Sequence, residues 1–151
     1  INSAAINDPD IIKNSSKYFG SQCIVVAVDV KKNNASWKVH THGGTKNTNI
    51  DALNWLKKVE DLGAGEILLT SMDGDGTQNG YDLLLTQTVA NAVNIPVIAS
   101  GGAGSVEDIY DVFTKGKASA ALLASLLHDK KLTIDEIKSF LIEKKLPMRP
   151  N

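Results

Sequence analysis

Short apolar runs alternate with amphipathic stretches along this chain, and this alternation limits the folds open to it. The first run, residues 24–28, ends at Asp29, and similar runs occupy residues 66–70, 97–100 and 120–123. Strands this uniformly apolar are typical of a parallel sheet that is covered on both faces. Helical spacing of apolar residues precedes the first run and follows every run. The sequence therefore predicts an α/β fold of four strand–helix units with right-handed crossovers.

Local signals add detail to this order of elements. Ser105 with Asp108, and Thr133 with Glu136, have the spacing of capping boxes at two helix starts. Residues 37–42 alternate at period two and predict a short hairpin outside the core. The opening residues 1–5 have the character of a strand end that leads through a turn into a helix, so we expect the chain to be cut from something longer.

The composition excludes several classes of protein. The 151 residues include 16 basic and 17 acidic side chains, and a net charge of −1 gives no attraction to nucleic acid or to an acidic membrane. We find no apolar run long enough to cross a membrane and no readable export signal. The single cysteine, Cys23, excludes an intrachain disulfide. We expect one domain over residues 1–151 in the reducing cytoplasm.

The residues suited to chemistry follow the ends of the predicted strands, which is the edge where parallel α/β folds bind ligands. Residues 100–104 read Ser-Gly-Gly-Ala-Gly before a helix, and Ala124 with Ser125 precedes a short helix one strand later. Backbone amides of such loops bind phosphate. The pairing of the two loops predicts a phosphate site, and the alternative is that these glycines only turn the chain.

Carboxylates follow two of the strands. Asp29 closes an apolar strand and suits a general acid or base, although a structural pairing with a nearby lysine remains the alternative. Asp73 and Asp75 resemble the start of a calcium loop, but Leu84 stands where that loop needs glutamate. A substrate-binding loop and a solvated acidic turn both remain open for this segment.

Histidines offer a weaker signal. His40 and His42 alternate along the expected hairpin, but no third ligand lies nearby in the sequence. We therefore expect a surface hairpin here and no metal site.

Four stretches carry a resemblance to a known family. They are VVAVDVK at 25–31, GAGEILLTSMD at 63–73, DGT with GYD within 75–82, and IASGGAG at 98–104. Together they resemble the cyclase subunit of imidazole glycerol phosphate synthase, in the part that runs from the end of the fourth strand of its (β/α)8 barrel to the C-terminus. The resemblance implies the C-terminal half of a TIM barrel. Four βα units do not close a barrel, so we expect self-association.

The resemblance also implies an activity. In that family a glutaminase partner supplies ammonia, and the cyclase subunit, a lyase of histidine biosynthesis, converts a bisphosphorylated ribulosyl formimino carboxamide ribotide to imidazole glycerol phosphate and aminoimidazole carboxamide ribotide. No cofactor is expected. Asp29 matches one of two catalytic aspartates; the other, on the first strand, is missing from this chain, so we expect this half alone to be nearly inactive.

Further site residues are carried over position by position from the family. Glu66 matches a charged residue at the ammonia-entry end, where the partner docks, and Asp75 matches a loop aspartate that assists substrate handling. The residues matched to the two substrate phosphates are Gly76, Thr77, Gly102, Ala124 and Ser125 for one, and Asn2 and Ser3 for the other. The chain departs from the common family pattern at Ser3, at Gly74 and at Ser119.

Two other functions remain open. The isomerase of the preceding pathway step shares the fold and handles a nearly identical bisphosphate. A catalytically inert, self-associating half-barrel that binds phosphate is the alternative outside the enzymes.

Overall fold

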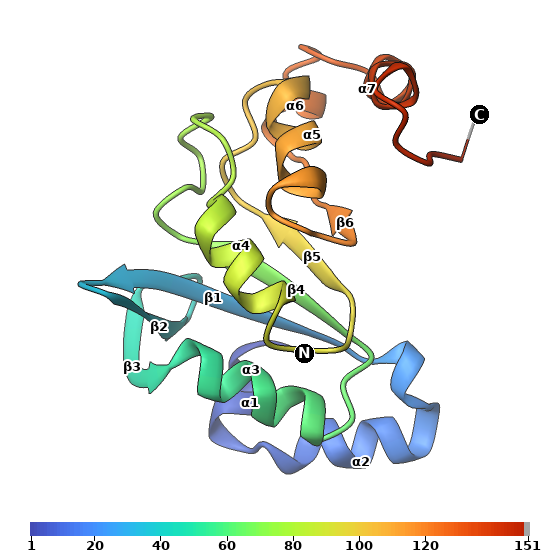
Figure 1. The fold of residues 1–151 in the computed structure, drawn as a ribbon. Helices are drawn as coiled ribbons and strands as arrows, with labels where there is room; N and C mark the ends of the chain where they lie inside the picture. The colour runs from blue at the N-terminus through green and yellow to red at the C-terminus, as the bar shows by residue number, and fades with distance from the viewer. Residues whose placement is uncertain (150–151) are drawn as a thin grey trace.

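A six-stranded sheet runs through the molecule in the order β3-β2-β1-β4-β5-β6, and this computed structural model describes residues 1–149 (Figure 1). Four strands are parallel to their neighbours, and they add to the sheet in the order of the chain. These are β1 (Val25–Asn33), β4 (Glu66–Ser71), β5 (Val97–Ser100) and β6 (Ala120–Ala121). The hairpin of β2 (Ser36–Thr41) and β3 (Lys46–Asp51) joins β1 in antiparallel fashion.

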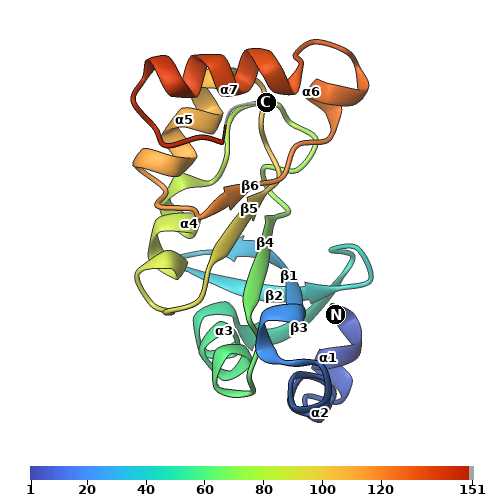
Figure 2. The same cartoon turned by 90° about the vertical axis from the view of Figure 1, so that its right-hand side faces the viewer.

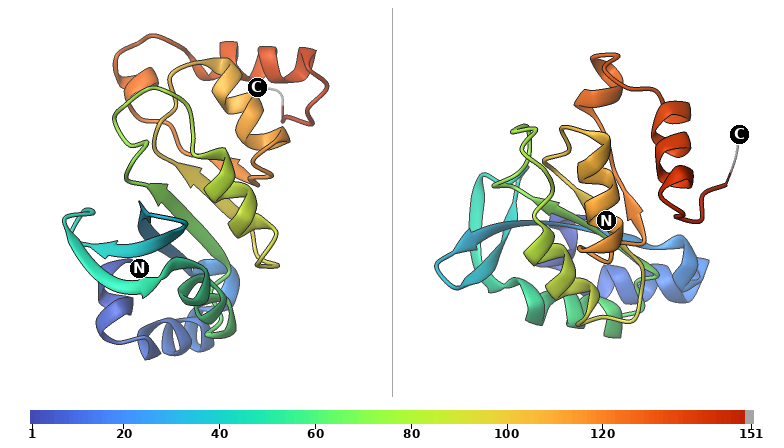
Figure 3. Two further views of the ribbon diagram at one scale, coloured as in Figure 1. Left: turned by 60° about the vertical axis from the view of Figure 1, so that its left-hand side comes forward. Right: turned by 45° about the horizontal axis from the view of Figure 1, so that its top comes forward.

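The helices alternate with these strands. They are α1 (Ser3–Asn7), α2 (Asp10–Phe19), the short 3-10 helix η1 (Ser21–Cys23), α3 (Ala52–Asp61), α4 (Leu83–Ala90), α5 (Val106–Thr114), α6 (Ser125–His128) and α7 (Ile134–Glu143). The four predicted strand–helix units are confirmed, and they succeed one another as neighbouring units of a (β/α)8 barrel do. Figure 3 shows α7 beyond α5 at one end of the sheet, with α1 and α2 at the other.

The two faces of the parallel strands differ in burial. Val26, Val28 and Val30 of β1 are fully buried, as are Ile67 and Leu69 of β4. The residues between them, such as Val25 and Leu68, are only half-buried. Figure 2 shows α3, α4 and α5 on one side of β4, β5 and β6. Helices therefore cover one face of these strands, and the other face is open.

Ile1 pairs with the start of β1. Its amino group donates a hydrogen bond to the carbonyl of Val25 (2.8 Å), and its carbonyl accepts one from the amide of Ala27 (2.7 Å). This is the hydrogen-bond pattern of parallel neighbours. The chain then turns at Asn2 into α1, as the character of residues 1–5 predicts.

Both predicted capping boxes are present, at Ser105 with Asp108 in α5 and at Thr133 with Glu136 in α7. The predicted extent of other elements was less accurate. The last strand has two residues, Ala120–Ala121, rather than the four of the apolar run at 120–123. None of the helices within residues 1–149 has the length and hydropathy that a membrane span requires.

The expected hairpin is present, but its placement outside the core was wrong. β1 continues to Asn33, so β2 pairs with its far half, and Val39 lies opposite Val30. Val39, His40 and Thr41 are buried. Val39 belongs to the same apolar cluster as the β1 valines, because the hairpin extends the sheet rather than leaving it.

Candidate functional site

A row of polar residues crosses the open face of the sheet, with Asp29 near its middle. Asp29 of β1 is in register with Thr70 of β4, and Thr70 with Ser100 of β5. On the other side, Asp29 is opposite His40 of β2. Directly paired residues point to the same face of a sheet. Because Val28 and Val30 point into the core, these polar side chains point to the open face.

Asp29 is buried and has a neutral partner. Its side chain is 8% exposed, and its Oδ2 accepts a hydrogen bond from Nδ2 of Asn2 at 3.3 Å. Asn2 thus comes from the start of the chain to orient the carboxylate. A carboxylate held in this way has the placement that proton transfer requires. Asp29 lies in the middle of β1 and does not close the strand as the apolar run predicts, because pairing with β2 continues the strand to Asn33.

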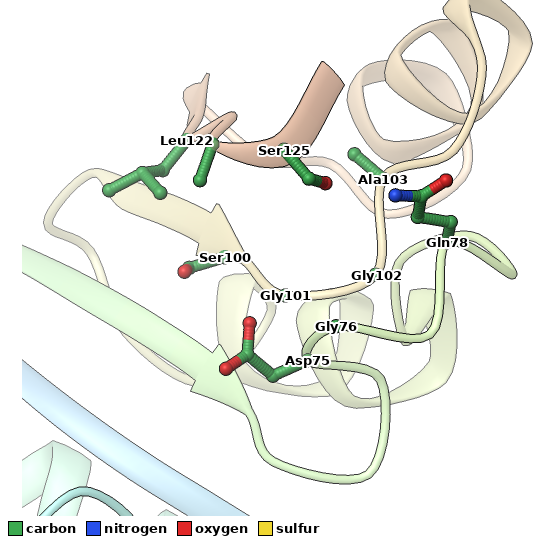
Figure 4. Close-up of a pocket in the computed structure, with 10 residues that line it drawn as sticks. Asp75, Gly76, Gln78, Ser100, Gly101, Gly102, Ala103, Leu122 and Ser125 are labelled. Atoms are coloured by element: carbon green, nitrogen blue, oxygen red, sulfur yellow. The ribbon is translucent and has the colours of Figure 1, made fainter. Parts of the chain in front are cut away.

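A cavity of about 50 Å³ lies at the carboxyl ends of β4, β5 and β6 (Figure 4). Its lining consists of residues from the loops that follow these three strands and from the end of β5. They are Asp75, Gly76, Gln78, Ser100, Gly101, Gly102, Ala103, Leu122, Ala124 and Ser125. Several water molecules, or one small anion, fit a space of this size. The structure therefore brings together the two loops that the sequence pairs as a phosphate site.

The loop after β4 and the loop after β5 are hydrogen-bonded to each other and closely packed. The amide of Gly80 donates to the carbonyl of Gly102 at 2.8 Å. A Cβ on Gly102 would collide with the carbonyl oxygen of Gly80, and Gly102 has a φ of 108°. Only glycine satisfies both conditions. The glycine run therefore shapes one wall of the cavity as well as turning the chain.

A second cavity, of about 300 Å³, lies between α1 and the β2–β3 hairpin. Ser3, Thr41, His42, Lys46 and Asn47 are among its lining residues, and no Asp or Glu of residues 1–149 lines it. The amide of His42 donates to Oγ of Ser3 at 3.2 Å. Within residues 1–149 the structure shows no ion pair to the exposed Lys46. Ile6 and Ile50 also line this cavity, so its lining is only partly polar, and Lys46 is the feature that suits it to an anionic group.

Other predicted residues lie outside these cavities. The hydroxyl of Thr77 donates to the carbonyl of Gly74 at 2.8 Å, so it stabilises its own loop. Oδ2 of Asp73 accepts from the amide of Lys32 at 2.7 Å and ties the acidic loop to β1, whereas Asp75 lines the first cavity. Glu66 is the first residue of β4 and is in register with Val25, the first residue of β1. It therefore lies at the amino-terminal ends of the parallel strands, the edge of the sheet opposite to the first cavity.

His40 and His42 lie in different surroundings. His40 is 8% exposed, and its Nδ1 lies 3.1 Å from the carbonyl of Lys38, so Nδ1 carries the hydrogen and donates. His42 is exposed and lines the second cavity. In the part of the chain that the structure describes, no three His, Cys, Asp or Glu side chains are placed to hold a metal ion.

Tyr81 contacts a residue that lines the first cavity. Nothing in the sequence except its place after Gly80 indicates this role. Its hydroxyl donates to the carbonyl of Leu122 at 2.9 Å and so fixes the end of the last strand. Burial, with a smaller contribution from the charge of Asp108, raises the pKa of this phenol well above its usual range. Tyr81 therefore remains a neutral donor at physiological pH.

Comparison with known proteins bears on this site. The chain matches the family described as Histidine biosynthesis protein over residues 1–133. It is similar to the imidazole glycerol phosphate synthase subunit HisF of Prochlorococcus marinus subsp. pastoris, with 77% identity over 154 residues. The subunits of the same name from two further Prochlorococcus marinus strains are 74% and 63% identical to this chain.

The alignments cover 100% of this chain for the first two relatives and 99% for the third. They cover 60%, 60% and 59% of the relatives, so the chain spans about three fifths of their length. The family match itself includes Asp29, both glycine-containing loops and the Ser3 cavity. The chain therefore belongs to the histidine biosynthesis protein family.

Proposed function

We propose that this chain is the C-terminal part of a cyclase subunit of imidazole glycerol phosphate synthase. In this proposal the sheet edge binds a bisphosphorylated ribotide, and Asp29 transfers a proton during ring closure. The position of Asp29 between two anion-suited cavities carries the proposal. Resemblance to the cyclase subunits supports the identity of the substrate.

The order of strands supports a substrate with two phosphates. The first cavity lies at the ends of β4, β5 and β6, Asp29 is on β1, and the second cavity lies against β2 and β3. If a ligand placed one phosphate in each cavity, its central part would lie over Asp29. Gly102, Ala124 and Ser125 would hold one phosphate, and Ser3 would contact the other. Asp75, which carries a negative charge at the first cavity, would accept hydrogen bonds from hydroxyl groups of the ligand.

The chemistry of cyclisation needs proton transfers at separate positions. Ammonia must lose protons after it attacks an electrophilic carbon, and the leaving amine must gain one. Asp29 can supply one of these transfers. The family pattern assigns the other to an aspartate on the first barrel strand, which lies outside these 151 residues.

The opposite edge of the sheet suits a partner protein, and we propose that a glutaminase subunit docks there. Glu66 begins β4 at this edge. Tyr18 and Phe19, at the end of α2, are 82% and 60% exposed and stack edge-on with ring centroids 4.7 Å apart. Exposed aromatic residues of this kind are enriched at protein interfaces.

The decisive experiment completes the barrel with the N-terminal part of the Prochlorococcus marinus relative and measures ammonia-dependent cyclisation of the ribotide. We expect Asp29→Asn to lower kcat by about 100-fold or more. Asp61→Asn, an exposed position at the end of α3, is the matched control and should retain the rate. Full activity of Asp29→Asn would exclude its role in proton transfer. Turnover of the isomerase substrate, without cyclisation, would favour the related isomerase instead.

A further inference from the structure

The side-chain amide of Gln78 has a fixed orientation at the first cavity. Its Oε1 accepts a hydrogen bond from Nζ of Lys131 at 2.8 Å. A lysine ammonium has donors and no acceptor, so the amide oxygen must face Lys131 and the amide nitrogen must point the other way. Figure 4 shows this nitrogen on the side of Ala103, which lines the same cavity.

We infer that Gln78 is a phosphate-binding residue of this cavity and that Lys131 is the residue that positions it. The inference rests on the proposed function, because it takes the ligand of the cavity to be a phosphate. The NH2 group of Gln78 donates a hydrogen bond to a phosphate oxygen, and Lys131 prevents the amide from turning its oxygen toward the anion.

The composition of the cavity makes this donor important. Asp75 is the charged residue among the described residues that line the cavity, and it is negative. The anion must therefore be held by backbone amides and by neutral side-chain donors, which are those of Gln78, Ser100 and Ser125. A donor whose direction is already set loses less conformational entropy when the anion binds.

The backbone of Gln78 is also held in place. Gln78 has a φ of 56°, in the left-handed region. Its carbonyl oxygen lies against Gly104, where a Cβ would collide with it. The loop after β4 thus packs against the glycine loop after β5, and this contact fixes the position of Gln78.

Lys131 is better suited to act through Gln78 than directly on the phosphate. Its Nζ is also 3.7 Å from Oδ2 of Asp129, which offsets its charge, and both side chains are about half exposed. Its backbone amide donates to the carbonyl of Leu126 at 3.0 Å, which fixes the segment between α6 and α7. Long-range attraction from such a solvated ion pair is weak.

The test measures the binding of inorganic phosphate to the full chain by isothermal titration calorimetry. We expect Gln78→Leu to bind phosphate about tenfold more weakly, a factor that corresponds to about 1.4 kcal/mol. Gln78→Glu retains an acceptor for Lys131 and should also lose affinity, because it has no donor left. Asn79→Asp places the same charge on the neighbouring exposed residue, outside this cavity, and should lose much less.

Lys131 is tested by variants that separate positioning from charge. Lys131→Arg keeps a donor and should keep the affinity, whereas Lys131→Met should weaken binding several-fold. Lys130→Met removes one charge from the adjacent exposed residue and serves as the control. If Lys131 acts through Gln78, Lys131→Met has little further effect in the Gln78→Leu background. A full additional loss in that background would overturn the positioning role.

The outcomes separate this inference from the proposed function. If the unmodified chain does not bind phosphate, both are wrong. If it binds phosphate and Gln78→Leu binds equally well, the phosphate site stands and the role of Gln78 is overturned. Circular dichroism of each variant verifies that the comparison is made between folded proteins.

Discussion

Asp29 and His40 are directly opposite each other on β1 and β2, and each side chain is 8% exposed. A carboxylate and an imidazole thus lie side by side and buried, on a face of the sheet where Leu68 and Thr70 are only half-buried. Asp29 accepts a hydrogen bond from Asn2, and His40 donates one to the carbonyl of Lys38. The hairpin therefore forms part of the site, because it supplies one wall of the environment of Asp29.

Truncation of His40 should destabilise this hairpin. His40→Ala removes a buried cross-strand side chain and its hydrogen bond to the carbonyl of Lys38, so we expect a loss of about 1 to 2 kcal/mol in the free energy of unfolding. Urea denaturation measures the loss. His42→Ala, at an exposed position, should change stability by less than about 0.5 kcal/mol. Equal effects of the two substitutions would contradict the burial of His40.

The contact between the two glycine loops makes a second prediction. Gly102→Ala places a Cβ against the carbonyl of Gly80, so we expect a loss of about 2 kcal/mol or more in stability, together with weaker phosphate binding. Gly43 also has a positive φ, of 63°, but a Cβ there would contact nothing within 4 Å. Gly43→Ala should therefore cost about 1 kcal/mol and leave phosphate binding unchanged. If the Gly102→Ala protein were as stable as the Gly43→Ala protein, the two loops would not be in the close contact described above.

The N-terminus of α7 should respond to acid. The backbone amide of Thr133, followed by its hydroxyl, donates to the carboxylate of Glu136 and lowers the pKa of that carboxyl from its ordinary 4.5. A lowered pKa in the folded state means that the contribution to stability is present above the ordinary pKa and is lost as the pH falls through the folded value. Hydrogen exchange of the α7 amides should accelerate on acidification in the unmodified chain, after correction for intrinsic rates.

Glu136→Gln is the matched variant for this experiment, because glutamine also fits a capping box but does not titrate. Its α7 amides should show a smaller change between about pH 6 and about pH 3. An identical response in the two proteins would mean that Glu136 is not the group responsible.

The open face makes a prediction for the chain in isolation. Leu68, Ile98 and Ala120 are half-buried on that face, Leu122 is 41% exposed, and β6 forms an edge of the sheet. Such a surface favours association. We expect sedimentation at micromolar concentration to show a dimer or a larger species, and Leu122→Lys to shift it toward the monomer. Leu84→Lys, on an exposed part of α4, is the control. A folded monomer would contradict the expectation.

The elements that the sequence predicts well are those with short-range signals. The buried strands follow from apolar runs, and the capping boxes from residues three positions apart, because both depend on neighbours along the chain. The extension of β1 to Asn33 depends on a partner strand and has no such signal. The burial of His40 follows from that extension, so the sequence alone suggested a surface histidine.

The candidate site shows the same division. The two loops predicted to bind phosphate lie at strand ends, where topology alone brings them together. The different positions of Asp73 and Asp75 depend on a hydrogen bond with the distant Lys32. The contact between Gln78 and Lys131 joins residues 53 positions apart, and no periodicity relates them. Sequence reasoning therefore identified the location of the cavity but not the side chains that orient its donors.

The apolar interior is divided into two clusters that meet at β5. Val97 belongs to the cluster that contains the β1 valines, whereas Ala99 belongs to the one formed with α5 and α7. Asp29 thus depends on one set of apolar contacts, and the loops of the first cavity depend on the other. Mutations that accumulate beneath α5 and α7 can reshape the first cavity while β1, which carries Asp29, keeps its own apolar support. Selection can act on these two properties separately.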